Sequence, residues 1–298
     1  MDYTLLIVTP SSNCDPLFPG SKYHRNKVYS KIMSLRPANL MHGIARSPEE
    51  MVASSNITRK WIECRISNFE YLMNLNTIAG RTYNDLSQYP VFPWVLSDYT
   101  SDSIDFQNPL LDCFRDLSKP IGAQVADRAE QADIKYQSLP QDGLDPPFHW
   151  GTHYSNPGAI LYFLVRMEPY TTLHIDLHGR FDHPDRQFYS VAQSYDSSTR
   201  GQGDCKELIP EFFYLPEFLV NANNFDFGMR HDGKPPHDVE LPNWAKDTED
   251  FITKHRLVGH LLQINNILLI LFYMICKNRL VAQLICCRLT TFYWYYVF

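Results

Sequence analysis

The sequence predicts a mainly helical fold with long extended, irregular core segments and minor β-structure. Helix-start signatures recur along the chain, whereas residues 81–94 combine aromatic rings with two prolines and show neither helical nor alternating periodicity. Proline has no amide N–H and fixes φ, so these prolines exclude a helix interior and a central strand. The rings of Tyr89, Phe92 and Trp94 still require burial, and we therefore expect the chain to bury extended backbone here.

Buried backbone of this kind needs polar partners, because no regular ladder satisfies its peptide groups. Arg81, Asn84, Asp85 and Gln88 lie within the run and carry suitable side chains. We expect such residues to supply the missing hydrogen bonds.

Residues 1–26 are predicted to be a leader or the stub of an upstream domain. A strand-like run, Tyr3–Val8, is followed by sequence rich in Pro, Ser and Asn. A helix is expected to start at Ser47, because Glu50 completes a capping box with it and Pro48 suits the first turn.

Ser67 and Glu70 repeat the capping-box pattern and predict a helix that Gly80 closes. Residues 81–122 are then expected to be extended and turning. Residues 127–148 are polar and contain prolines, which predicts a surface loop.

Three further segments carry recognisable signals. Asn156 followed by Pro157 predicts a helix start. The run Tyr170–Leu177 favours a strand, and Pro184–Ala192 favours a helix that begins at its proline. Prolines divide Leu208–Val220 into short pieces.

The composition is that of a globular protein with an acidic body. The 298 residues carry a formal charge of −6, and 44% of them are apolar. Beyond Arg256 there are three basic residues and no acidic one, so residues 1–256 hold 24 basic and 33 acidic residues, a charge of −9. This balance argues against nucleic acid as a partner and against direct electrostatic docking on anionic lipid. Of the seven cysteines, Cys14, Cys64, Cys113 and Cys205 are scattered singly and no CxxC occurs, and the amino terminus has no signal-peptide pattern. These features favour a reduced cytosolic setting.

A dense group of metal-ligand residue types consists of His174, Asp176, His178, Asp182, His183 and Asp185. One hypothesis is a metal-dependent hydrolase that uses His174, His178 and Asp182. The alternative is structural: the residues before Asp182 would alternate along a strand without converging on it, and Asp182 and His183 would cap the following helix.

Motifs of common enzyme classes do not occur in the sequence. His149 and His153 lack the glutamate of HExxH, and GxSxG, GxxxxGK[ST] and GxGxxG are not found. Cys64 and Cys205 each precede a basic residue, but sequence adjacency alone does not indicate an activated thiol. We therefore predict no catalytic residue, no metal and no cofactor.

Charged residues within the aromatic, proline-rich sequence predict ion pairs that fix irregular backbone. They are Arg81, Asp85, Arg115, Asp116 and Lys119. Removing one member of a buried pair typically costs about 3–5 kcal/mol. The functional alternative is that such residues line a groove for a partner.

Ordered blocks along the chain resemble the BEACH domain family, in particular its neurobeachin-like branch. The blocks are Ile66–Leu72, Arg81–Trp94, Phe114–Gly122, Gly151–Asn156, Phe181–Arg186, Lys206–Pro216 and Leu241–Ala245. The resemblance implies a BEACH domain over residues 27–256 that acts as a non-enzymatic scaffold or adaptor in vesicle trafficking and membrane dynamics through protein–protein docking.

The resemblance also implies partners and a place in the cell. The expected partners are a PH-like domain, normally upstream in the same chain, and trafficking proteins. The expected localisation is cytoplasmic and peripheral on endomembranes. A groove shared with the PH-like domain is the expected docking site, with Arg81, Asn84, Asp85 and Tyr89 as candidate residues.

The resemblance ends after Arg256, and the domain is therefore expected to be incomplete at its carboxyl terminus. Residues 257–298 are hydrophobic, and Leu257–Cys276 is uncharged and long enough to span a bilayer. One hypothesis is a membrane-anchored interaction protein. The other is a tail translated from non-coding sequence.

Overall fold

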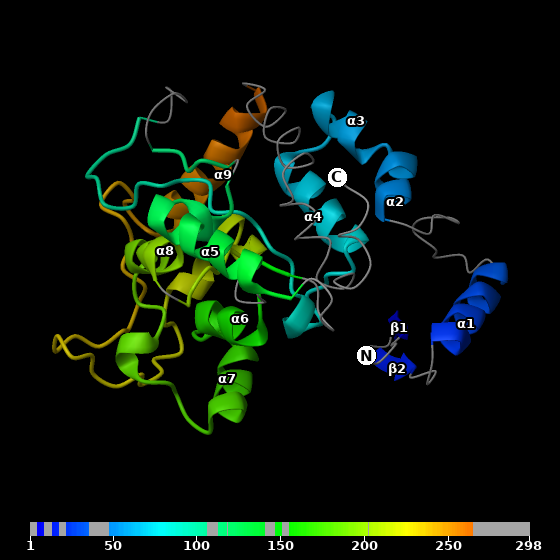
Figure 1. The fold of residues 1–298 in the computed structure, drawn as a ribbon. Helices are drawn as coiled ribbons and strands as arrows, with labels where there is room; N and C mark the ends of the chain where they lie inside the picture. The colour runs from blue at the N-terminus through cyan, green and yellow to red at the C-terminus, as the bar shows by residue number, and fades with distance from the viewer. Residues whose placement is uncertain are drawn as a thin grey trace. The chain divides into compact units, whose positions relative to one another are not determined.

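The structure is a computed structural model that describes residues 5–8, 14–17, 22–35, 48–105, 113–117, 119–140, 147–150, 155–201 and 203–264. The chain divides into two compact units, residues 1–56 and 57–298. Helices make up most of the described elements (Figure 1), which confirms the predicted mainly helical class with minor β-structure.

The first unit combines a small antiparallel sheet with two helices. β1 (Leu5–Val8) pairs with β2 (Cys14–Leu17). α1 (Lys22–Ser34) and α2 (Pro48–Ser55) follow. β1 confirms the strand-like run at the amino terminus, and α2 begins at the proline where the sequence predicts a helix start.

The second unit is built from α-helices and short 3-10 helices. The α-helices are α3 (Ile57–Ile62), α4 (Asn68–Ile78), α5 (Ala126–Ser138), α6 (Pro157–Leu164), α7 (Tyr170–His178), α8 (Val191–Arg200) and α9 (Thr248–Ile264). The 3-10 helices are η1 (Leu86–Gln88), η2 (Ile121–Ala123), η4 (Pro184–Arg186), η5 (Pro210–Phe213) and η6 (Pro216–Leu219). α6 packs against α7, and α9 packs against η5 and η6.

Two helix starts in this unit follow the capping predictions. The Ser67 hydroxyl accepts a hydrogen bond from the Glu70 N–H, and the Glu70 carboxylate accepts one from the Ser67 N–H at 2.8 Å. Gly80, with φ of 77°, follows the end of this helix. Asn156 caps α6 by accepting from the Ala159 N–H at 2.9 Å.

The prediction of a strand at Tyr170–Leu177 is wrong, because this segment forms α7. The buried Thr171 donates its hydroxyl to the Val165 carbonyl at 2.7 Å, which anchors the first turn of the helix. Gly179, with φ of 75°, ends the helix in the left-handed conformation. End signals and tertiary contacts therefore outweigh the strand preference of β-branched residues.

The prediction of a surface loop at residues 127–148 is wrong over residues 127–138, which lie in α5. Asp127 in the first turn and Lys135 in the last turn both suit the helix dipole. The side chain of Ala132 is buried, whereas most of the helix faces solvent. A helix with so little apolar surface has no clear periodicity in its sequence.

The single helix predicted from Pro184 through Ala192 is also wrong. Pro184 starts the short η4, and α8 begins separately at Val191 with Ser190 as its N-cap. His183 caps η4 through its side chain, which agrees with the structural role proposed for it.

The core of the second unit is aromatic and surrounds extended segments. Its fully buried rings belong to Tyr89, Phe92, Trp94, Phe163, Phe188, Phe212, Phe218 and Phe251. Isolated antiparallel bridges join Phe92 to Leu208 and Leu96 to Phe114. The burial of extended backbone predicted for residues 81–94 is therefore confirmed around Tyr89, Phe92 and Trp94, whereas Tyr83 and Asn84 of the same run are exposed.

Side chains provide hydrogen bonds that a neighbouring strand would otherwise supply. Asn76 accepts from the Val91 N–H at 2.9 Å and donates to the Val91 carbonyl at 3.0 Å. Arg81 donates to the Tyr89 carbonyl at 2.7 Å. The predicted support by Arg81 is confirmed, and Asn76 adds a support that the sequence did not indicate.

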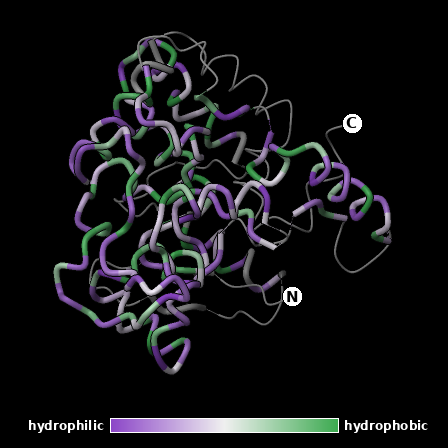
Figure 2. Tube along the Cα trace, turned by 90° about the vertical axis from the view of Figure 1, so that its left-hand side faces the viewer, coloured by the Kyte–Doolittle hydropathy of each residue, from purple (hydrophilic) through white to green (hydrophobic). Residues whose placement is uncertain are grey.

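Hydrophobic and hydrophilic residues alternate in short stretches along the traced chain (Figure 2). None of the described helices is both long enough and apolar enough to cross a membrane. α9 includes residues 257–264 of the apolar segment Leu257–Cys276, and the rest of that segment lies outside the described residues. The membrane-anchor hypothesis therefore stays a prediction.

Candidate partner-docking site

The four predicted docking residues fall into two groups. Arg81 and Tyr89 are buried, and the Arg81 guanidinium holds the Tyr89 carbonyl. Asn84 is exposed, and the half-buried Asp85 caps η1 by accepting from the Ser87 N–H at 2.9 Å. Arg81 and Tyr89 thus support the backbone, while Asn84 and Asp85 lie on the turn between them.

The hydroxyl of Tyr89 points to a group of tyrosines around one buried carboxylate. Tyr89 donates to Glu211 Oε1 at 2.6 Å, and Tyr214 donates to the same oxygen at 3.3 Å. Tyr170 Oη lies 3.3 Å from Tyr89 Oη. The Tyr83 ring packs edge-on against the Tyr89 ring, with centroids 5.4 Å apart. We call these five residues the tyrosine cluster.

Two rings of the tyrosine cluster reach the surface. Tyr83 is 38% exposed and Tyr214 is 44% exposed, whereas Glu211 is 3% exposed. Phe69 of α4 packs edge-on against Tyr214, with centroids 5.8 Å apart. The Tyr83 hydroxyl lies 3.8 Å from Met73 Sδ, also on α4. The cluster therefore joins α4, α7, η5 and the segment around η1 at one place on the surface.

The carboxylate of the tyrosine cluster is poorly solvated. Burial raises the pKa of Glu211, while hydrogen bonds from Tyr89 and Tyr214 act against that rise. Burial and the nearby carboxylate raise the pKa of Tyr89, so its hydroxyl remains a donor at neutral pH. Glu211 Oε2 is buried and has no hydrogen-bond partner within the described part of the chain. This oxygen can accept a further donor.

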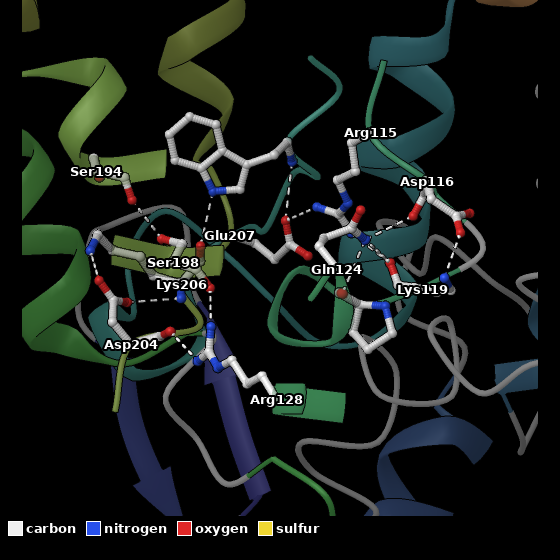
Figure 3. Close-up of polar contacts among 12 residues, drawn as sticks. Arg115, Asp116, Lys119, Gln124, Arg128, Ser194, Ser198, Asp204, Lys206 and Glu207 are labelled. Carbon is white, nitrogen blue, oxygen red and sulfur yellow. Dashed lines mark hydrogen bonds and ion pairs between the residues drawn. The ribbon is translucent and has the colours of Figure 1, made fainter. Parts of the chain in front are cut away.

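A second buried carboxylate, Glu207, is paired with an arginine (Figure 3). Arg115 donates to Glu207 Oε2 at 2.7 Å, and the two side chains are 0% and 7% exposed. The Trp94 N–H donates to the same oxygen at 3.1 Å, and Trp94 Nε1 donates to the Lys206 carbonyl at 3.0 Å. Arg115 also donates to the Lys119 carbonyl at 3.2 Å. This network ties three separate extended segments together.

A neighbouring polar group attaches α5 to the rest of the unit (Figure 3). Arg128 on α5 donates to the Ser198 carbonyl at 2.5 Å and to the Asp204 carbonyl. Asp204 in turn pairs with Lys206 and accepts from the Ser197 hydroxyl at 2.8 Å. These contacts hold a helix that buries little apolar surface.

The ion pairs predicted in this region form only in part. Asp116 and Lys119 pair at 3.3 Å on the exposed surface. The buried partner of Arg115 is Glu207, which lies 92 residues further along the chain. Asp85 caps η1 instead of balancing a buried cation. The local charge pattern identified the right arginine but not its partner.

The residues of the hypothetical metal site make other contacts. His174 is buried on α7, and its Nε2 accepts from the Asp182 N–H at 3.3 Å. His178 Nδ1 lies 3.0 Å from the His174 carbonyl, and Asp182 pairs with Arg186 at 2.5 Å. Within the described ranges, no group of three or more His, Cys, Asp or Glu side chains is arranged to hold a metal ion. The contacts observed here stabilise the turn after α7.

His149 and Cys205 also have structural surroundings. His149 pairs with Asp133 at 2.9 Å, whereas His153 lies outside the described residues. Cys205 is buried, and desolvation raises the pKa of its thiol to about 12. A thiol in this environment stays protonated at neutral pH and is a poor nucleophile.

Comparison with known proteins identifies the class of this domain. The Beige/BEACH domain family model matches residues 59–262. Over 211 residues the chain is 50% identical to the putative neurobeachin homolog of Caenorhabditis elegans. That match covers 70% of this chain and 8% of the relative, so the chain spans a small part of the relative's length.

The chain therefore belongs to the BEACH family, and it is neurobeachin-like, as the sequence blocks predict. The matched residues lie within the second compact unit. The domain bounds 27–256 inferred from the sequence stay a prediction.

Most of the tyrosine cluster has no clear signal in the sequence. Glu211 and Tyr214 lie in Lys206–Pro216, one of the blocks that carry the family resemblance. An acidic residue inside such an aromatic, apolar run was the available signal. Tyr170 gave no signal, because its segment reads as a strand.

Proposed function

We propose that this BEACH domain is a non-enzymatic scaffold or adaptor that acts in vesicle trafficking and membrane dynamics through protein–protein docking. The observation that carries the proposal is the tyrosine cluster, in which two partly exposed rings adjoin a buried carboxylate. Tyrosine is enriched in binding hot spots because it combines a large apolar ring with a polar tip. Membership of the BEACH family supports the same proposal.

The backbone near the tyrosine cluster is held by buried polar contacts. Arg81 holds the Tyr89 carbonyl, and Asn76 bonds both backbone groups of Val91. A surface that is ordered before binding loses less conformational entropy when a partner docks. This rigidity favours a docking module over a segment that folds on binding.

The proposed partners are a PH-like domain, normally in the same chain, and trafficking proteins. The proposed localisation is cytoplasmic, with peripheral association on endomembranes. Because residues 1–256 carry a charge of −9, we propose that membrane association depends on the partner and not on direct attraction to anionic lipid.

The test is isothermal titration of the full chain with the purified PH-like domain of a neurobeachin-type protein. We expect the double variant Tyr83→Ala/Tyr214→Ala to weaken binding at least about tenfold, because hot-spot side chains dominate interface affinity. Met229→Ala is the control, since Met229 is 60% exposed and lies outside the tyrosine cluster. Thermal unfolding of each variant checks that the fold is retained.

Two results would contradict the proposal in different ways. No measurable binding of the PH-like domain to the wild-type chain would exclude that partner. Equal affinity of the wild type and the double variant would place docking at another surface.

A further inference from the structure

Glu211 is a buried carboxylate with one satisfied oxygen and one that lacks a hydrogen-bond partner within the described ranges. Oε1 accepts from Tyr89 at 2.6 Å and from Tyr214 at 3.3 Å. Oε2 is buried and accepts no hydrogen bond from any described residue. A buried polar atom in this state carries an uncompensated desolvation penalty, which a suitable donor would remove.

The contrast with Glu207 shows what kind of donor is missing. Glu207 pairs with Arg115, and both side chains are buried. No ion pair to Glu211 is found among the described residues. Buried carboxylates are normally paired, so a cation is the donor that would both satisfy Oε2 and balance the charge of Glu211.

The surroundings of Glu211 are also those that attract a cation. Tyr83, Tyr89, Tyr170 and Tyr214 gather around the carboxylate, and aromatic ring faces attract ammonium and guanidinium groups. Tyr83 and Tyr214 are partly exposed, and exposed side chains change rotamer within nanoseconds.

We propose that the tyrosine cluster receives a lysine or arginine side chain of a docking partner, with Glu211 as its counter-charge. The proposal rests on the proposed docking function and specifies the chemistry of the partner. The excess of acidic residues in the chain also favours a partner with a basic surface. In such a site, the tyrosine rings would contact the partner's side chain and Glu211 Oε2 would accept from its charged group.

The test is an NMR titration of the full chain with carbon-13-labelled tyrosine rings. The probes are N-acetyl-arginine amide and N-acetyl-lysine amide, with N-acetyl-norleucine amide as the neutral control. Tyr83→Phe and Tyr214→Phe assign the ring signals. We expect at least one basic probe to shift the Tyr83 and Tyr214 signals saturably, with a dissociation constant on the order of 1 mM for a single side chain. The neutral probe should produce no saturable shift.

Two variants test the roles of charge and ring. Glu211→Gln keeps the shape and one acceptor oxygen but removes the charge, and should weaken the basic probe at least about tenfold. Tyr214→Leu removes a ring of the cluster and should also weaken binding of the basic probe at least about tenfold. This variant keeps the proposal testable if Glu211→Gln does not fold. Equal response to norleucine, no saturable response to either basic probe, or unchanged binding in a folded variant would overturn the proposal.

The two proposals fail in distinguishable ways. If the PH-like domain docks through Tyr83 and Tyr214 but neither basic probe binds, the docking function stands and the basic-side-chain proposal is overturned. If a basic probe binds at Glu211 but the PH-like domain does not dock, the cation site stands and that partner is excluded.

Discussion

Glu207 and Glu211 lie four positions apart and are both buried, yet their surroundings differ. Glu207 faces Arg115 and the Trp94 N–H, so its charge is balanced inside the unit. Glu211 accepts from the hydroxyls of Tyr89 and Tyr214, has no cation paired with it among the described residues, and keeps one oxygen unbonded there. The comparison separates a carboxylate that completes the fold from one whose remaining oxygen is available to a partner.

The largest expected effect comes from breaking the pair at Glu207. Arg115→Met leaves this carboxylate buried without a cation and should lower the free energy of unfolding by about 3–5 kcal/mol. Urea unfolding followed by circular dichroism measures the change. Lys119→Ala is the control, because its pair with Asp116 is exposed and should contribute less than about 1 kcal/mol. If Arg115→Met lowers the free energy of unfolding by less than about 1 kcal/mol, the charge of Glu207 is compensated by something other than Arg115.

His255 extends the comparison to a buried ring whose Nε2 lacks a hydrogen-bond partner among the described residues and which stays neutral at pH 7. Its ring packs 4.4 Å from the Phe251 ring, and its Nε2 accepts no hydrogen bond from the described residues. Burial lowers the pKa of His255 to about 3. The unfolded chain therefore binds this proton near pH 6.5 and the folded chain only near pH 3, so stability falls as the pH drops through that window.

The effect of His255 is measured by unfolding at two pH values. Between pH 7 and pH 5 this residue alone should remove about 2 kcal/mol of stability. His255→Leu should reduce the pH dependence by that amount, whatever its effect on stability at pH 7. The same pH dependence in the wild type and the variant would assign the acid sensitivity to other groups.

The smallest expected effect on stability is that of Glu211→Gln. Because burial raises the pKa of Glu211, its ionised form opposes folding at neutral pH, and this contribution is absent at low pH where the carboxyl is protonated. The glutamine variant should be unchanged or more stable by up to about 1 kcal/mol at pH 7. Glu207→Gln should lose more stability in the same urea assay, because it weakens a buried ion pair. An equal loss of stability in Glu207→Gln and Glu211→Gln would show that the two carboxylates do not differ in their contribution to folding.

The sequence predicts best those features whose cause is local. The capping box of Ser67 and Glu70, the cap at Asn156 and the prolines of the 81–94 run each act through adjacent backbone, and each prediction is confirmed. The strand predicted at Tyr170–Leu177 failed because local preference competed with the Gly179 end signal and the contact of Thr171.

Contacts between residues far apart in the sequence could not be predicted from the local sequence pattern. Arg115 was identified as a buried cation, but its partner Glu207 comes close only through tertiary folding. The tyrosine cluster likewise joins Tyr89 to Glu211 across 122 positions. The residue types predict that buried polar groups need hydrogen-bond or ion-pair partners, but tertiary folding determines which residues form those pairs.

The two bonds between Asn76 and Val91 have a consequence for the backbone of the core. Buried N–H and C=O groups need hydrogen-bond partners, which a neighbouring strand normally supplies. At Val91 both groups are occupied by one amide side chain, and the Trp94 N–H is occupied by a carboxylate. Because Val91 and Trp94 are buried, these bonds let the segment stay extended inside a β-poor fold without a sheet around it.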